Sequence, residues 1–187
     1  GTASFVSLHV DSGLANGIAL MLDAYNTGTP MVVTSANYDA RKVTEVKTDL
    51  AELVRPVTKW AVELTLPDQI PGAIRRAFNE ANSHPKGPVY VGFSSNALEG
   101  TAEMNIVPSS KIHDSPRPDM KGIQEATALL VASSKPMMIV GDRVSDDDAV
   151  NQAIELAELL GLPVYQSRGA EVAFPTTHPQ FMGNHSL

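Results

Sequence analysis

The chain has 187 residues, enough for one large or two small domains, and 43% of them are hydrophobic while only 5% are aromatic. Its formal net charge is −7 and its Lys and Arg residues are scattered, which excludes a basic surface for nucleic acid. No apolar run approaches the roughly 18 residues of a membrane span, and the absence of cysteine excludes disulfides and thiolate catalysis. We therefore predict a globular, cytoplasmic protein without nucleic acid or membrane partners.

The first half of the sequence alternates strands with helices. Apolar periodicity predicts helices over 12–25, 50–54 and 67–82, and strands over 5–10, 31–35, 59–64 and 88–93. A strand, a crossover helix and a second strand form a right-handed parallel unit. The order therefore predicts an α/β fold with doubly wound parallel sheets.

The periodicity stops after residue 94. Pro108, Pro116 and Pro118 accumulate there together with Gly, Ser and Asp, and we interpret residues 95–120 as a linker. Beyond it, a second parallel α/β unit is predicted from helices over 122–133 and 147–160 and strands over 137–140 and 163–166. The predicted domains are therefore 1–94 and 121–187.

The segment from His9 to Asn16 ends the first strand and opens the first helix. In open α/β sheets, ligands bind where strand carboxyl ends meet helix N-termini, so this segment is a candidate ligand edge. Gly13 and Gly17 would each weaken an isolated helix by roughly 1 kcal/mol, which calls for another reason for their presence. We interpret Gly17 as a packing residue, whereas Gly13 suits either packing or close approach of a ligand.

Each residue of this segment also has a purely structural interpretation. His9 is then a partly buried hydrogen-bonding histidine, Asp11 or Ser12 an N-cap, and Asn16 a partner of neighbouring loop backbone. The sequence contains no GxGxxG fingerprint, P-loop or GxSxG elbow. From the residues alone, both interpretations stay open.

Other clusters carry weaker signals. His113, His178 and His185 lack the spacing of a metal site, so we predict no metal ligands in this chain. Asp146, Asp147 and Asp148 are interpreted as capping the helix that follows them. The segment 141–143 follows a strand as a nucleotide loop would, but it lacks the further glycines.

Taken in order, several segments resemble the thiamine diphosphate-dependent enzymes, most closely the benzoylformate decarboxylase and acetohydroxyacid synthase group. The segments are LHVDSGLANGIALMLDAYNTGTPMVVTSA, RPVTKWAVEL, PDQIPGAIRRAFNEANSHPKGPVYVGF, LLVASSKPMMIVGDRV, AIELAELLGLPVYQS and FPTTHPQFMG. The resemblance implies the C-terminal part of a pyrimidine-binding domain over 1–94, followed by the start of a Rossmann-like central domain over 121–187. It covers nearly the whole chain.

The resemblance also assigns roles to the candidate edge. His9 matches the active-site histidine of benzoylformate decarboxylase-like members, while Gly13 and Asn16 match the glycine and asparagine of the family's cofactor-binding motif. His9 would then lie near the thiazolium ring and offer a proton or a hydrogen bond. The synthases lack this histidine, which favours a decarboxylase or lyase. Asp11 and Ala15 depart from the closest pattern, and this bears on the substrate.

The implied protein is part of a thiamine diphosphate-dependent 2-oxo acid decarboxylase, lyase or carboligase. Its partners would be a 2-oxo acid or aldehyde and further copies of itself, as a homodimer or homotetramer. In the family, the glutamate that tautomerises the aminopyrimidine precedes this segment, and Mg²⁺ is bound with the diphosphate by a domain that follows it. We therefore predict that this chain is an internal fragment, without activity or full stability by itself.

Further expectations concern FAD, His178 and the alternative functions of the chain. FAD, which some synthases bind in the central domain, has no diagnostic residue here, and His178 matches a structural position. A noncatalytic α/β module that binds a nucleotide or cofactor at the Gly13 helix terminus is the alternative function. A regulatory or structural domain of a larger assembly is the third.

Overall fold

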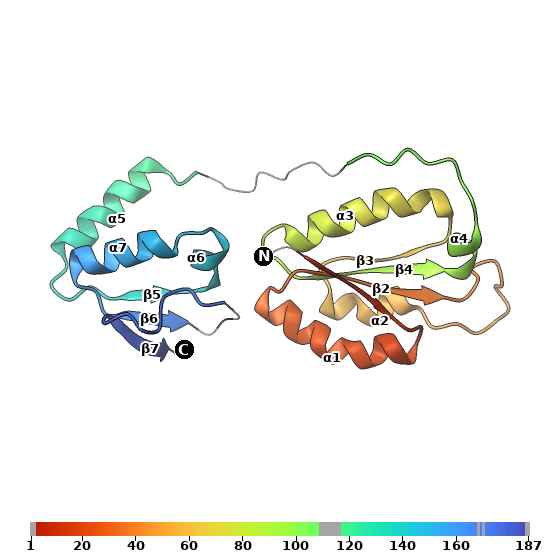
Figure 1. Ribbon diagram of the computed structural model, residues 1–187, viewed down its shortest axis with the longest axis horizontal. Helices are drawn as coiled ribbons and strands as arrows, with labels where there is room; N and C mark the ends of the chain where they lie inside the picture. The colour runs from red at the N-terminus through yellow and green to blue at the C-terminus, as the bar shows by residue number, and fades with distance from the viewer. Residues whose placement is uncertain (1–2, 109–116, 168, 170, 186–187) are drawn as a thin grey trace. The chain divides into compact units, whose positions relative to one another are not determined.

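The chain forms two compact units, Gly1–Asp114 and Ser115–Leu187. The structure is a computed structural model, and it describes residues 3–108, 117–167, 169 and 171–185. Figure 1 shows the elements of both units, and each unit is a layered α/β structure of its own.

The first unit is a parallel sheet covered by helices on both faces. Its elements are β1 (Ser4–Leu8), α1 (Ser12–Thr27), β2 (Met31–Asn37), α2 (Leu50–Val54), the 3₁₀ turn Arg55–Val57, β3 (Ala61–Leu64), the 3₁₀ turn Pro67–Gln69, α3 (Ile70–Asn82), β4 (Pro88–Ser94) and α4 (Ser95–Glu99). The strand order is β1-β2-β4-β3, and every pair is parallel. Helices α1 and α2 cover one face and α3 the other (Figure 1). The predicted doubly wound fold is confirmed.

The two central strands carry most of this core. Val32, Val89 and Val91 point toward α3, whereas Val33 and Tyr90 point toward α1 and α2. All five side chains are buried, and burial of one valine stabilises the fold by about 1.5 to 3 kcal/mol. Because neighbouring residues of a strand face opposite sides, β2 and β4 must be apolar almost throughout. This requirement explains the apolar runs in the sequence.

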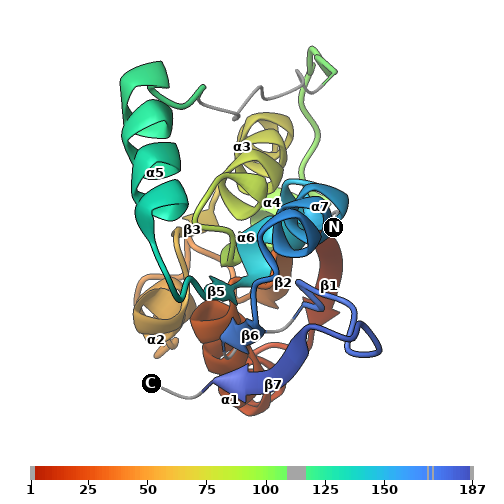
Figure 2. The same cartoon turned by 90° about the vertical axis from the view of Figure 1, so that its left-hand side faces the viewer.

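The second unit has one covered sheet face. Its elements are α5 (Met120–Ala132), β5 (Met138–Val140), α6 (Asp142–Asp146), α7 (Val150–Leu160), β6 (Val164–Ser167) and β7 (Phe181–His185). The parallel strands have the order β5-β6-β7, and α6 and α7 lie on the same side of them in both views (Figures 1 and 2). Its core contains Val140, Ala157, Leu162, Val164 and Phe174.

The predicted helix over 147–160 is wrong at its start. Helix α7 begins only at Val150, because Asp148 adopts a φ of 55° and separates it from α6, which ends at Asp146. Asp147 follows the last turn of α6, where its carboxylate pairs with Arg143 at 3.3 Å. The N-cap position of α7 is occupied by Ala149 without a side-chain hydrogen bond, so the predicted capping by the three aspartates is also wrong.

Two elements lie where the sequence predicts none. Helix α4 falls within the predicted linker, and Asn96 anchors it by donating to Thr65 O at 2.7 Å and accepting from Ala40 N at 2.8 Å. Strand β7 has only two apolar residues at its start, and its pairing with β6 defines it. Both depend on contacts between distant parts of the sequence. Residues 109–116 of the predicted linker, with His113, lie outside the described residues.

Candidate functional site

The first helix approaches the end of the first strand closely. A Cβ added to Gly13 would lie 2.7 Å from His9 Cβ, and one added to Gly17 would lie 2.6 Å from Leu8 Cδ1. Real Cβ atoms do not approach so closely, so position 13 needs glycine, whereas a side chain at position 17 would require the end of Leu8 to move. The glycines that weaken α1 therefore let it pack against the carboxyl end of β1, as predicted for Gly17.

The ring of His9 presents one nitrogen to solvent. His9 follows the last residue of β1, and its Nδ1 lies 3.1 Å from Val10 O. A carbonyl oxygen only accepts hydrogen bonds, so the proton is assigned to Nδ1. Nε2 is then left with a lone pair on an exposed side chain, and it can accept a hydrogen bond or carry a proton.

Asp11 connects His9 to the helix through strained backbone. It has φ 53° and ψ −94°, a conformation rare for a residue with a side chain, and its carbonyl accepts from Ala15 N at 2.8 Å. Its side chain makes no capping bond, and its buried Oδ1 has no hydrogen-bond partner among the described residues. Asp11 thus occupies the N-cap position without the side-chain cap that the structural interpretation expects.

Asn16 lies on α1, three residues after Gly13 and therefore near it on the helix surface. Its side chain is exposed, and it makes no hydrogen bond to the residues that the structure describes. The expected bond to loop backbone is not seen. The N-terminal end of α1 thus brings together His9, Gly13 and Asn16. The side chains of His9 and Asn16 are open to solvent there.

A second polar group lies at the carboxyl ends of the central strands. Ser35 of β2 and Tyr90 of β4 join their hydroxyl groups at 2.7 Å under α1 and α2. Burial raises the pKa of Tyr90 to about 12, and the hydrogen bond to Ser35 offsets part of this effect. The phenol therefore stays protonated at neutral pH.

Asn37 at the end of β2 joins three segments. Its Oδ1 accepts from Tyr38 N at 2.8 Å, and its Nδ2 donates to Thr48 O at 3.2 Å and to Glu63 Oε2 at 2.7 Å. The side chain is buried. The carboxamide of Asn37 thus holds together the two ends of the loop over residues 38–48, which is a compact loop of the Ω type.

The loop over 38–48 is tied at further points. Lys47 Nζ contacts Glu63 Oε1 at 3.1 Å, and Arg41 binds both carboxylate oxygens of Asp39. These hydrogen bonds from Arg41 lower the pKa of Asp39 to about 2. Val46, by contrast, is fully exposed near the end of the loop.

The described residues offer no ready metal centre. They contain no group of three His, Cys, Asp or Glu side chains placed to hold an ion. No helix in this part of the chain is long and apolar enough to span a membrane.

Comparisons with known proteins show which family the chain is similar to. Residues 123–187 match the family described as thiamine pyrophosphate enzyme, central domain. The benzoylformate decarboxylase of Pseudomonas aeruginosa is 28% identical over 98% of this chain and 36% of its own length. The crystal structure of the benzoylformate decarboxylase from Polynucleobacter necessarius superposes with a TM-score of 0.87, at 26% identity over 98% of this chain and 35% of that one. Residues 123–187 thus match the central domain of thiamine diphosphate-dependent enzymes, and nearly the whole chain is similar to members of that family.

The resemblance predicted from the sequence is therefore confirmed, and so is the parallel α/β fold. The large subunit of acetolactate synthase isozyme 3 from Escherichia coli is 31% identical over 98% of this chain and 33% of its own length. The chain thus spans about a third of the length of these relatives. Along the chain, the boundary between the two compact units falls between residues 114 and 115, inside the predicted linker. The assignment of 1–94 to a pyrimidine-binding domain stays a prediction.

In the segment that matches the central-domain family, His178 has a packed environment. Its ring meets the edge of Phe174 at 5.1 Å, its Nδ1 accepts from Gln180 N at 3.3 Å, and its Nε2 lies 3.3 Å from a Glu158 carboxylate oxygen. Because Nδ1 accepts, Nε2 is the donor, the reverse of His9. These contacts agree with the structural role expected for His178.

The sequence did not indicate the roles of Asn37, Glu63 and Tyr90. Thr48 and Glu63 lie 11 and 26 residues from Asn37 along the chain, so no local spacing links them. One signal was available. Ser35 and Asn37 lie two residues apart at the end of β2, which places both on the same face of the sheet.

Proposed function

We propose that this chain is part of a thiamine diphosphate-dependent 2-oxo acid decarboxylase, lyase or carboligase, and that residues 1–94 belong to its pyrimidine-binding domain. The observation that carries the proposal is the superposition of nearly the whole chain on a benzoylformate decarboxylase, with an exposed histidine at the carboxyl end of β1. The histidine favours decarboxylase or lyase chemistry over that of the synthases. A cytoplasmic homodimer or homotetramer is the proposed form.

The residues at the start of α1 suit the edge of a bound cofactor. His9 offers an unprotonated Nε2, and Asp11 holds a buried carboxylate oxygen that has no partner among the described residues. Both are groups that a polar ligand can satisfy. By contrast, the described residues contain no cluster suited to Mg²⁺, and we propose that the ion and the diphosphate are bound by another part of the protein.

When bound, thiamine diphosphate supplies the electron sink for cleavage beside a carbonyl carbon. We propose that this chain contributes His9, which exchanges a proton with the substrate oxygen through Nε2 while Val10 O keeps Nδ1 protonated. Gly13 allows α1 to hold the His9 backbone close to the sheet. Asn16 supplies an exposed carboxamide beside it.

The test uses the full-length protein with thiamine diphosphate, Mg²⁺ and benzoylformate. His9→Ala should lower kcat by roughly 10²- to 10⁴-fold, the range for loss of a general acid–base, with little change in cofactor affinity measured by calorimetry. Asn26→Ala, at an exposed position near the far end of α1, is the matched control and should retain full activity.

The outcomes separate the proposed functions. A full-length protein that does not bind thiamine diphosphate overturns the proposal and favours a noncatalytic module. Unchanged decarboxylation and carboligation rates in His9→Ala overturn only the role of His9.

A further inference from the structure

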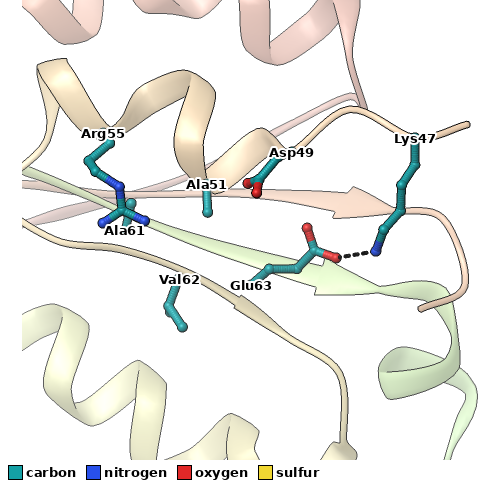
Figure 3. Close-up of a pocket in the computed structure, with 7 residues that line it drawn as sticks. All are labelled: Lys47, Asp49, Ala51, Arg55, Ala61, Val62 and Glu63. Carbon is teal, nitrogen blue, oxygen red and sulfur yellow. Dashed lines mark hydrogen bonds and ion pairs between the residues drawn. The ribbon is translucent and has the colours of Figure 1, made fainter. Parts of the chain in front are cut away.

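A second concave site lies in the first unit between α2 and β3. Its volume is about 390 Å³, and its lining is Lys47, Asp49, Ala51, Arg55, Ala61, Val62 and Glu63 (Figure 3). Strand β3 is the outermost strand of the described sheet on this side, so no further described strand fills the space beside it. His9 is not among the lining residues.

The lining combines a small apolar floor with two charged ends. Ala51 and Ala61 provide short side chains along the middle, whereas the side chain of Val62 points to the α3 face of the sheet. Figure 3 shows Arg55 at one end of the cavity, and Lys47 paired with Glu63 toward the other, with Asp49 beside them. The lining therefore carries one cation, Arg55, at one end and the cation Lys47 with two carboxylates at the other.

The guanidinium of Arg55, at one end of the cavity, is held by one nitrogen and, within the described part of the chain, leaves the others free. Arg55 binds Glu52 through Nε at 2.7 Å, and its terminal nitrogens have no hydrogen-bond partner among the described residues. The hydrogen bond to Glu52, with the charge of Asp49 nearby, raises the pKa of Arg55. A planar guanidinium with free terminal nitrogens is suited to a carboxylate.

The carboxylates at the other end are also held in place. Asp49 Oδ1 accepts from Glu52 N at 2.9 Å as the N-cap of α2, while its Oδ2 has no partner in the described part of the chain. Glu63 is held by Asn37 and Lys47. A small ammonium group would find acceptors here without any rearrangement of the backbone.

We propose that this cavity binds a small zwitterion of the α-amino acid class, with its carboxylate at Arg55, its ammonium group at Asp49 and Glu63, and its side chain over Ala51 and Ala61. A simple anion would meet two carboxylates, and a simple cation would meet Arg55 and Lys47. The charged Glu63 on an edge strand also disfavours addition of a peptide strand, which leaves a small ligand as the occupant. The site is independent of the proposed cofactor edge.

The experiment compares three probes on the full-length protein, followed by amide chemical shifts and by calorimetry. L-Alanine should bind in the millimolar range and shift the amides of Ala51, Ala61 and Val62. Propionate, which lacks the ammonium group, and ethylamine, which lacks the carboxylate, should each bind at least about tenfold more weakly.

Two variants assign the ends of the ligand. Arg55→Gln should weaken L-alanine binding about tenfold and leave ethylamine unaffected. Asp49→Asn retains an N-cap of equal quality, so α2 is kept, and it should weaken both L-alanine and ethylamine. Arg75→Gln and Asp68→Asn are matched charge changes outside the cavity and should have no effect.

Several results would overturn the proposal. Propionate that binds as tightly as L-alanine would make this an anion site. Equal effects of Arg55→Gln and Arg75→Gln, or no amide shifts at tens of millimolar L-alanine, would show that the cavity binds no zwitterion.

Discussion

Asn37 illustrates how much structure can depend on one side chain. Its carboxamide uses both its oxygen and its nitrogen, and it links the end of β2 to Tyr38, to Thr48 and to Glu63. Because the side chain is buried, each bond that is lost would leave a partner unsatisfied away from water. The order of residues 38–48 therefore depends on this residue.

Asn37→Ala should destabilise the protein by about 2 to 4 kcal/mol, because three hydrogen bonds are lost and one of them involves a charged carboxylate. Hydrogen exchange followed by mass spectrometry should show faster exchange over 38–48, and chemical denaturation should give the change in free energy of unfolding. Asn26→Ala, at an exposed position, should change stability by less than about 0.5 kcal/mol. Unchanged exchange in the loop would contradict the role of Asn37 as its anchor.

Tyr90 gives the protein a dependence on alkaline pH. Burial raises the pKa of Tyr90 to about 12 in the folded state, whereas an unfolded tyrosine ionises near pH 10. The unfolded chain loses this proton first, so the contribution to stability is complete below pH 10 and disappears as the pH rises toward 12. The free energy of unfolding should fall across this window.

Tyr90→Phe should remove that part of the pH dependence, at the cost of about 1 kcal/mol at neutral pH for the lost bond to Ser35. Denaturation curves between pH 9 and 12 measure both effects, within the window that the shifted pKa of Tyr90 defines. Tyr25→Phe, at an exposed position on α1, is the control. If Tyr90→Phe and wild type lose stability in parallel over this range, the buried phenol is not responsible.

Helices α5 and α7 differ in how far their side chains are buried. Helix α7 places Ala157 in the core of the second unit. Helix α5 has no buried residue, and Leu129 and Val131 are about three-quarters exposed, at 74% and 76%. A helix of 13 residues without tertiary packing is marginal in water.

Backbone amides over 120–132 should therefore exchange with solvent much faster than those over 150–160 in the 187-residue chain. Protection factors from hydrogen exchange at neutral pH provide the measurement, with both helices observed in the same sample. Equal protection of the two helices would mean that α5 is stabilised by packing that its exposed surface does not show.

At the scale of the molecule, the chain is about a third of its relatives. It aligns with nearly all of its length to 36% of a benzoylformate decarboxylase and 33% of an acetolactate synthase subunit. Phe5 on β1, at one end of the described strand order, is 54% exposed. Such apolar surface is in line with the predicted limited stability of the isolated chain, which stays a hypothesis.

We predict that the 187-residue chain alone does not consume benzoylformate when thiamine diphosphate and Mg²⁺ are added. The described residues offer no metal cluster, and an anchored cofactor is required for turnover. Coupled detection of the aldehyde product provides the assay, with a full-length relative as the positive control. Cofactor-dependent turnover by the chain alone would contradict this prediction.

The sequence by itself determined the order of most strands and helices, the parallel sheets and the place of His9 at a strand end. These features follow from local periodicity and from the handedness of crossovers, which a short window of residues carries. Helix α2 was predicted with its observed bounds, Leu50–Val54. The resemblance of several segments, taken in chain order, also indicated the thiamine diphosphate-dependent enzymes.

Only the tertiary structure decided which distant residues meet. The pairing of Asn37 with Glu63, the contact of Gly13 with His9, the pairing of β7 with β6 and the anchoring of α4 by Asn96 all join separate segments. Hydrogen bonds and close packing act through space, and their energies depend on geometry that the packed sheets and helices impose. Residue types and spacing along the chain do not contain that geometry.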